Sequence, residues 1–249
     1  MPVGLSKDAR IDNVLAANYT REAYMKKDEL TYWVIGAGRF GARAVERLYR
    51  KRPDAHFIVV DENLEALRRL SHLPVEKVCQ EGASYLQAHL DTDRAPAWII
   101  PAVPIHLAFE WVRLQTSDHA RIDVVPVPSK IASMLPNPVR GPEGQLYVSY
   151  ADFPCPDYCS EPFEKCTVTG KPRKGLLYKT LEEILYEDAI SVVIRSHQLA
   201  PGVGGYGPEV LKESLHRMSQ GKGLVLYSTA CLCHGVVHAF KILDRPEYR

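Results

Sequence analysis

The sequence predicts an α/β protein in which a doubly wound parallel sheet is followed by a smaller C-terminal α/β part. Apolar segments alternate with segments of helical periodicity from residue 30 to about residue 128, and such alternation is typical of a parallel sheet covered on both faces. A glycine-rich turn joins the first strand to the first helix. A run rich in proline and glycine, residues 128–144, precedes the C-terminal part, which carries a cysteine-rich loop.

These boundaries divide the chain into three predicted parts. Residues 1–29 are polar with scattered apolar positions, which predicts an N-terminal helical extension. Residues 30–128 form the predicted Rossmann-like domain, and residues 129–249 form the C-terminal α/β part.

The composition excludes several functional classes. The hydrophobic fraction is 46% and the charged fraction is 24%, as in a soluble globular protein with a sizeable core. The formal net charge of +1 gives no global field that would attract nucleic acid or an anionic membrane. The chain has no apolar run long enough to span a bilayer and no signal-peptide core at its N-terminus. We therefore expect a cytoplasmic protein that does not bind nucleic acid.

The elements of the first half follow from apolar spacing. The fourth strand is apolar on both faces, as a buried parallel strand should be. We expect strands at residues 32–35, 56–60, 75–78, 97–100 and 122–127, and, besides the helix after the glycine turn, helices at residues 64–70, 82–90 and 105–114.

The glycine turn follows the first strand and has the spacing of a dinucleotide fingerprint, GAGRFG at residues 36–41. Gly36 permits the tight turn, Gly38 lets the backbone approach a pyrophosphate, and Gly41 lets the helix pack on the strand. The positive end of the helix, which begins with Arg39 and Phe40, then faces the phosphates.

An acidic residue completes the fingerprint about twenty positions further on. Asp61 ends the second strand and is followed by Glu62, and two carboxylates at the ribose favour NAD(H) over NADP(H). The alternatives are a turn that binds nothing or binds another adenine nucleotide. Pro101 and His106 lie on the predicted rim of the cleft. His106 is the candidate for proton transfer, the alternative being a histidine that only caps a helix or packs.

Residues 31–90 resemble the regulatory NAD-binding domains of bacterial potassium-transport systems, the RCK or KTN family. These domains commonly carry an arginine inside the glycine turn, where Arg39 stands, and an acid at the end of the second strand, where Asp61 stands. After the third strand the family has glycine, an acid and alanine, whereas this chain reads QEGA at residues 80–83. The resemblance implies an NAD-binding module that regulates a membrane transporter.

The cysteine-rich loop is the second informative feature. Cys155, Cys159 and Cys166 have the spacing C-x3-C-x6-C between prolines that exclude a helix or an inner strand. Three thiols so close together can converge on one metal centre, either zinc or an iron–sulfur cluster. The alternative is three ordinary thiols in a surface loop.

The remaining C-terminal elements follow from local signals. Thr180 and Glu183 have the spacing of a capping box at a helix start, and Pro208 is suited to the first position of another helix. We expect strands at residues 146–150, 190–195 and 223–228, a glycine-rich loop at residues 196–207 and a last helix beginning near residue 235.

A second group of metal-ligating residues follows the last predicted strand. Cys231, Cys233 and His234 then lie at a strand end and a helix N-terminus, where the helix dipole lowers the pKa of a thiol. This group would supply the fourth ligand to the centre in the cysteine loop. The alternative for Cys231 is a small buried residue.

Two functional hypotheses from different classes remain open. In the first, the protein is an oxidoreductase in which NAD(H) and a metal or iron–sulfur centre cooperate with a redox partner. In the second, which the family resemblance implies, NAD(H) occupancy biases a conformational equilibrium that a potassium transporter senses, without catalysis. In both we expect a homo-oligomer.

Overall fold

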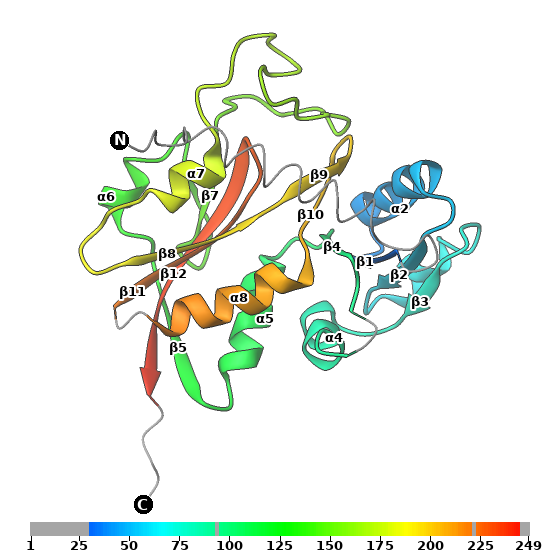
Figure 1. The fold of residues 1–249 in the computed structure, drawn as a ribbon, viewed down its shortest axis with the longest axis horizontal. Coiled ribbons are helices and arrows are strands. Elements are labelled where there is room, and N and C mark those ends of the chain that lie inside the picture. The colour runs from blue at the N-terminus through cyan, green and yellow to red at the C-terminus, as the bar shows by residue number, and fades with distance from the viewer. Residues whose placement is uncertain (1–29, 93–94, 221–222, 245–249) are drawn as a thin grey trace, which may run out of the picture.

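The computed structural model describes residues 30–92, 95–220 and 223–244, so the predicted helical extension lies outside the described residues. The α/β class is confirmed, and the described chain forms two main sheets with helices on their faces (Figure 1).

The first sheet has four parallel strands in the order β3-β2-β1-β4. The four predicted strands of this sheet are confirmed within one residue at each end. They are β1 (Thr31–Ile35), β2 (His56–Val60), β3 (Glu76–Val78) and β4 (Trp98–Pro101).

Helices cover both faces of the first sheet because alternate residues of β1 point to opposite sides. Tyr32 and Val34 pack in one cluster with α2 (Arg39–Lys51) and α3 (Leu64–Arg68). Trp33 and Ile35 pack in another cluster with α4 (Gly82–His89) and α5 (Leu107–Thr116). The sheet is therefore doubly wound, as the alternating pattern predicts.

The second sheet is mixed, with the order β6-β7-β12-β11-β8, and β5 also pairs with β12. Its central strand β12 pairs antiparallel with β11, while β11 and β8 are parallel. Its strands are β5 (Ala120–Val125), β6 (Val139–Arg140), β7 (Leu146–Ser149), β8 (Ile190–Arg195), β11 (Leu224–Ala230) and β12 (His234–Asp244).

The prediction of a fifth strand in the first sheet is therefore wrong. The strand exists, but it pairs antiparallel with β12, with Val125 opposite Ala239 and Ala120 opposite Asp244. The apolar residues of a strand do not specify which other strand it pairs with. Here the strand pairs with the edge of the long strand β12.

The last predicted helix is also wrong, because residues 234–244 form β12. Its side chains alternate between the two faces of the second sheet. Val237 and Ala239 pack in the core cluster on the face turned away from the first sheet, whereas Phe240 packs in the core cluster between the two sheets. This period of two, together with β-branched residues, favours a strand.

The predicted capping box is wrong as well. Helix α7 (Leu177–Glu182) contains Thr180, and Glu183 ends it. Leu177 and Leu181 are fully buried against the second sheet, so burial of this apolar pair determines where the helix lies.

The predicted glycine-rich loop forms a two-stranded hairpin, β9 (His197–Ala200) and β10 (Val203–Gly205). The hairpin leaves the end of β8 and reaches the first sheet (Figure 1). There the backbones of Tyr206 and Ile99 exchange two hydrogen bonds of 2.8 and 3.0 Å. Helix α8 (Pro208–Ser219) then returns to β11 and starts with Pro208 as predicted.

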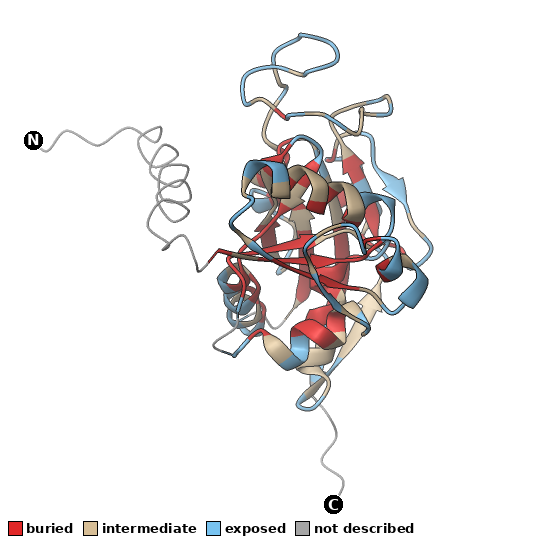
Figure 2. Ribbon diagram, turned by 90° about the vertical axis from the view of Figure 1, so that its right-hand side faces the viewer, coloured by how far each residue is buried: buried red, intermediate tan, exposed pale blue. Residues whose placement is uncertain are grey.

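The two sheets share one core. The cluster between them contains Trp33 of β1, Trp111 of α5, Leu211 of α8 and Phe240 of β12. Helix α6 (Ser129–Ala132) and α7 cover the far face of the second sheet. Buried residues fill the central strands, whereas the surrounding loops are exposed (Figure 2).

Across the described ranges, every helix is too short or too polar to cross a membrane.

The hairpin completes the core of the first sheet, which yields a prediction. Leu199 is 6% exposed and packs in the cluster of α2. Leu199→Ala should lower the free energy of unfolding by about 3 kcal/mol, because it leaves a cavity. Leu185→Ala is the control, since Leu185 is 88% exposed. Urea denaturation of both variants tests this, and equal unfolding free energies would contradict it.

Candidate functional site

Two glycines of the turn are required by the fold itself. Gly36 has φ +109°, and a Cβ there would lie 2.6 Å from the carbonyl oxygen of Ala102. A Cβ at Gly41 would lie 1.8 Å from the carbonyl oxygen of Gly36. Any side chain at Gly41 would therefore separate α2 from β1.

Gly38 is different, because neither its conformation nor its surroundings require glycine. Its φ of −69° and ψ of −168° are accessible to any residue. Apart from Gly38 itself and its neighbours along the chain, no atom of the described residues lies within 4 Å of the position of a Cβ at Gly38. Gly38 caps α2, whose first turn carries no acidic residue. The backbone can thus be approached closely from outside at the positive end of a helix, as anion binding requires.

Asp61 holds the glycine turn in place. Its Oδ2 accepts a hydrogen bond from the Ala37 N–H at 2.6 Å, and its Oδ1 accepts one from the Asn63 N–H at 2.8 Å. The predicted ribose ligand therefore also has a structural role, which spacing alone did not reveal. Glu62 is exposed beside it.

The other predicted nucleotide residues flank the turn. The Arg39 guanidinium lies 4.7 Å from the centroid of the Phe40 ring, and both side chains are exposed. Pro101 ends β4 opposite Ile35 of β1, at the carboxyl edge of the sheet.

The cysteine loop, residues 151–175, and the β11–β12 turn enclose one cavity of about 450 Å³, which we call the thiol cavity. The structure thus brings together the two groups of predicted ligands, although the loop is distant from the turn in sequence. Five of the six cysteines line the cavity, whereas Cys79 is exposed after β3. The side chains in its wall that offer sulfur, imidazole or carboxylate donors are Cys155, Cys159, Cys166, Cys231, Cys233, His234, Glu161, Asp152 and Asp157.

The β11–β12 turn arranges its thiol by backbone hydrogen bonds. The Cys231 N–H donates to the His234 carbonyl at 2.9 Å, which closes the turn. The Cys231 Sγ accepts from the N–H groups of His234 at 3.3 Å and Cys233 at 3.5 Å. Because β12 follows directly, the predicted helix dipole is absent from this turn.

Glu161 is a member of the site that the cysteine pattern did not reveal. Its carboxylate oxygen accepts hydrogen bonds from the N–H groups of Leu232 at 3.0 Å and Cys233 at 3.2 Å. The ligand atoms of Glu161, Cys231 and His234 lie within 4.8 Å of one another. Glu161 is buried and has φ +48°, an unusual backbone conformation for glutamate that is typical of functional sites.

The thiols at the turn are neutral without a cation. Burial raises the pKa of Cys231 far above its usual range, and the nearby Glu161 carboxylate raises it further. Burial also raises the pKa of Cys233 to about 11, although Arg173, which donates to its Sγ, opposes the shift. The predicted lowering of these pKa values by a helix is therefore wrong.

The loop thiols differ from one another. Burial and the neighbouring Cys159 raise the pKa of Cys155, whereas hydrogen bonding from the Thr169 backbone lowers the pKa of Cys166. These hydrogen bonds favour the thiolate of Cys166, and the thiolate is the form of cysteine that ligates a metal.

The thiol cavity adjoins the first turn of α2. Phe40 lines the cavity. Asp157, between the first two loop cysteines, forms an ion pair of 2.5 Å with Arg43, and its carbonyl accepts from Arg47 at 2.7 Å. The hydrogen bond from Arg43 lowers the pKa of Asp157. These contacts attach the cysteine loop to the helix that follows the glycine turn.

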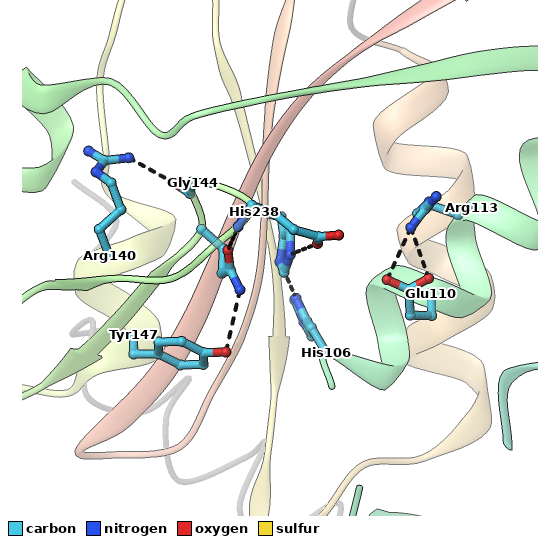
Figure 3. A network of polar contacts seen from close by, with 9 residues as sticks. His106, Glu110, Arg113, Arg140, Gly144, Tyr147 and His238 are labelled. Carbon is cyan, nitrogen blue, oxygen red and sulfur yellow. Dashed lines mark hydrogen bonds and ion pairs between the residues drawn. The ribbon is translucent and has the colours of Figure 1, made fainter. Parts of the chain in front are cut away.

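His106 caps α5 but does not face an open cleft. It is 8% exposed, and its Nδ1 lies 2.9 Å from the Nδ1 of His238 (Figure 3). Its Nε2 lies 2.8 Å from the Thr229 hydroxyl. The second sheet supplies both partners, neither of which sequence reasoning identified. The role of His106 in proton transfer stays a prediction.

Comparison with known proteins identifies a family. The family described as "AF_1314_C: Uncharacterized protein, C-terminal domain" matches residues 108–243. An "Uncharacterized protein" of Archaeoglobus fulgidus is 30% identical over 223 residues, which cover 84% of this chain and 98% of the relative. No solved structure matches. The family match begins inside α5 and includes β5, in agreement with the place of β5 in the second sheet.

The buried histidines predict a loss of stability in acid. Burial lowers the pKa of His238 to about 4, so the folded protein keeps it neutral while the unfolded chain protonates near pH 6.5. The contribution of His238 to the unfolding free energy should be constant above pH 6.5 and should fall by about 3 kcal/mol between pH 6.5 and 4. Urea denaturation at several pH values measures this, and His238→Phe should flatten the slope. A slope that His238→Phe leaves unchanged would contradict the assignment.

Proposed function

This chain belongs to the AF_1314_C family, and we propose that it is a dinucleotide-binding protein with a metal centre in the thiol cavity. One observation carries the proposal. Thiol, imidazole and carboxylate ligands from two distant segments surround one cavity whose wall includes Phe40, from the first turn of the helix behind the glycine turn.

The proposed metal is zinc. Cys231, His234 and Glu161 offer sulfur, nitrogen and oxygen, which are the three donor types that zinc accepts in a tetrahedral site. A loop thiolate would complete the site, and Cys166 is a candidate because hydrogen bonds from the Thr169 backbone and side chain lower its pKa. A divalent cation also compensates the buried Glu161 carboxylate and ionises the turn thiol, whose pKa is otherwise too high. An iron–sulfur cluster would instead use four of the five cavity thiols.

The proposed dinucleotide is NAD(H). Gly38 supports it, since glycine is needed there only if something outside the described residues approaches the backbone. Asp61 and Glu62 support the choice of NAD(H), because two carboxylates repel a 2′-phosphate.

Two activities are compatible with this pair of sites. The nearness of the thiol cavity to α2 favours an oxidoreductase, in which NAD(H) accepts or donates hydride and the metal polarises the substrate. The ion pair between Arg43 and Asp157 favours a sensing module instead, because it links the cysteine loop to the nucleotide helix. The second activity is the one expected of a regulator of potassium transport. We place the protein in the cytoplasm, where thiols stay reduced.

Metal binding is tested by titration with Zn²⁺ under reducing conditions. We expect one tightly bound ion per chain. Cys231→Ser should weaken the affinity about 100-fold or more because a ligand is lost, and Cys79→Ser, a change outside the cavity, should not alter it. Equal affinity in both variants would contradict the site. A visible absorption band after anaerobic purification would identify an iron–sulfur cluster instead.

Dinucleotide binding is tested with Gly38→Val. Valine fits the backbone conformation and the open space, so circular dichroism and the unfolding midpoint should match the unaltered protein. Fluorescence titration with NADH should show no binding, because the side chain occupies the place of the pyrophosphate. The unaltered protein should prefer NADH to NADPH. Normal NADH binding by the folded variant would show that the glycine turn is not the site.

A further inference from the structure

Arg173 places a positive charge in the wall of the thiol cavity, and neither of the two proposed sites uses it. The residue lines the cavity and is partly buried. Its Nη1 donates a hydrogen bond to the Cys233 sulfur, and Cys233 stands between Cys231 and His234 in the β11–β12 turn. The guanidinium therefore lies beside the donors of the proposed metal centre.

A short hairpin within the cysteine loop holds Arg173 in this place. Lys165 and Pro172 form an antiparallel bridge, and Gly170, with φ +66°, lies in the turn that joins them. At the other end of the side chain, the Nε of Arg173 donates to the Pro162 carbonyl at 2.7 Å. The guanidinium is thus fixed before any ligand arrives, as recognition of a small molecule requires.

The donors of this guanidinium are only partly used by the described residues. A guanidinium carries five N–H groups, and its two hydrogen bonds here go to a carbonyl oxygen and to a sulfur. The sulfur belongs to a thiol, which is mostly uncharged at pH 7. All carboxylates of the described residues lie beyond ion-pair distance of Arg173. Since burial of a cation is costly without an anion, Arg173 offers a contact that an anion fills.

The charges around the cavity leave a single positive charge in excess. Asp157 pairs with Arg43 of α2. The other acidic side chains in the wall are balanced by two exposed lysines, and these groups are Asp152, Glu161, Lys171 and Lys174. A zinc ion bound by two thiolates adds no net charge. The charge of Arg173 remains, which favours a ligand with one negative charge over a dianion.

The rest of the wall suits an apolar body of moderate size. Phe153, Pro156 and Val168 line the cavity together with Phe40 of α2. The volume of about 450 Å³ is within the range of small-molecule sites. The cavity therefore combines one open guanidinium with apolar surface.

We propose that the thiol cavity binds a small organic acid, whose carboxylate accepts two parallel hydrogen bonds from the Nη groups of Arg173. Such a pair matches the planar guanidinium to the planar carboxylate and is stronger than contact with an ammonium group. The apolar body of the acid packs against Phe153 and Val168. Lys171 and Lys174 attract the anion from solvent.

The relation of the acid to the metal rests on the proposed function. An acid bound at Arg173 lies next to a metal on Cys231 and His234, because Arg173 contacts the residue between these two ligands. An organic acid is then the substrate class of the metal centre. The contact with Arg173 itself needs neither metal nor dinucleotide, so it is tested by binding alone.

The anion is tested by isothermal titration calorimetry of the full-length reduced protein with benzoate. We expect one benzoate to bind per chain. Benzyl alcohol, which has the same ring without the charge, should not bind detectably. Phenyl phosphate, which is largely a dianion at neutral pH, should bind about 10-fold more weakly. Absence of benzoate binding, or equal or tighter binding of either analogue, would overturn the assignment of a carboxylate.

The residue is tested with Arg173→Lys, which keeps the charge and removes the planar fork. This variant should bind benzoate about 10-fold more weakly. Lys165→Gln is the matched control, because Lys165 is a cation of the same loop that does not line the cavity. Equal affinity in both variants would show that Arg173 does not hold the carboxylate.

A second pair of variants keeps the test valid if Arg173→Lys does not fold. Val168 lines the cavity and is 51% exposed, so the fold tolerates a polar side chain there. Val168→Glu should weaken benzoate binding about 10-fold by repulsion, and Val168→Gln, which has the same size without the charge, should weaken it less. Equal affinities in the two variants would exclude benzoate from the cavity.

Repetition of these titrations after saturation with Zn²⁺ separates the acid subsite from the metal centre. Benzoate binding that requires Zn²⁺ and is unchanged in Arg173→Lys would place the carboxylate on the metal and overturn the contact with Arg173. Benzoate binding by a protein that takes up no Zn²⁺ would support the subsite while the metal centre fails.

Discussion

The arrangement of this protein depends on one backbone contact, the pair of hydrogen bonds between Ile99 and Tyr206. It ties the hairpin that extends from the second sheet to the edge strand of the first. Leu199 and Val203 of that hairpin then complete the core over α2. Both residues of the contact are buried, where an unpaired backbone group is costly. The contact therefore fixes the position of the second sheet relative to the first. Each sheet contributes residues to the core cluster between them, so neither has a complete core without the other.

The thiol cavity depends on this relative position of the two sheets. The cysteine loop is held against the hairpin, where the Cys159 carbonyl accepts hydrogen bonds of 2.7 Å from both Gly202 and Gln198. The same loop is attached to α2 through Asp157. The electrostatic character of the cavity follows from its burial, because a buried carboxylate beside neutral thiols and imidazole is stabilised by a cation. The same physical situation, burial of polar groups with fixed partners, holds His106 between Thr229 and His238.

Local signals predicted the first sheet well. The spacing of apolar residues, the glycine turn and Asp61 predicted the strands β1 to β4 and the helices that cover them. Each of these features lies within a segment of a few residues, so it can be recognised in the sequence. The prediction failed where pairing or packing with a distant segment determined the secondary structure. Residues 234–244 are a strand because β11, β7 and β5 all pair with them, and Thr180 lies inside a helix because Leu177 and Leu181 must be buried.

The sequence by itself determined which residues are candidates for chemistry: the glycine turn with its acid, the loop cysteines, the Cys231 group and His106. These are visible in sequence because spacing within one segment limits what its backbone can form. Only the tertiary structure decided that Glu161 joins the thiols, that the loop lies against α2, and that His106 meets Thr229 and His238. These contacts join residues 70 or more positions apart in the chain. Burial and sheet pairing bring such residues together, and a single sequence contains no local record of either.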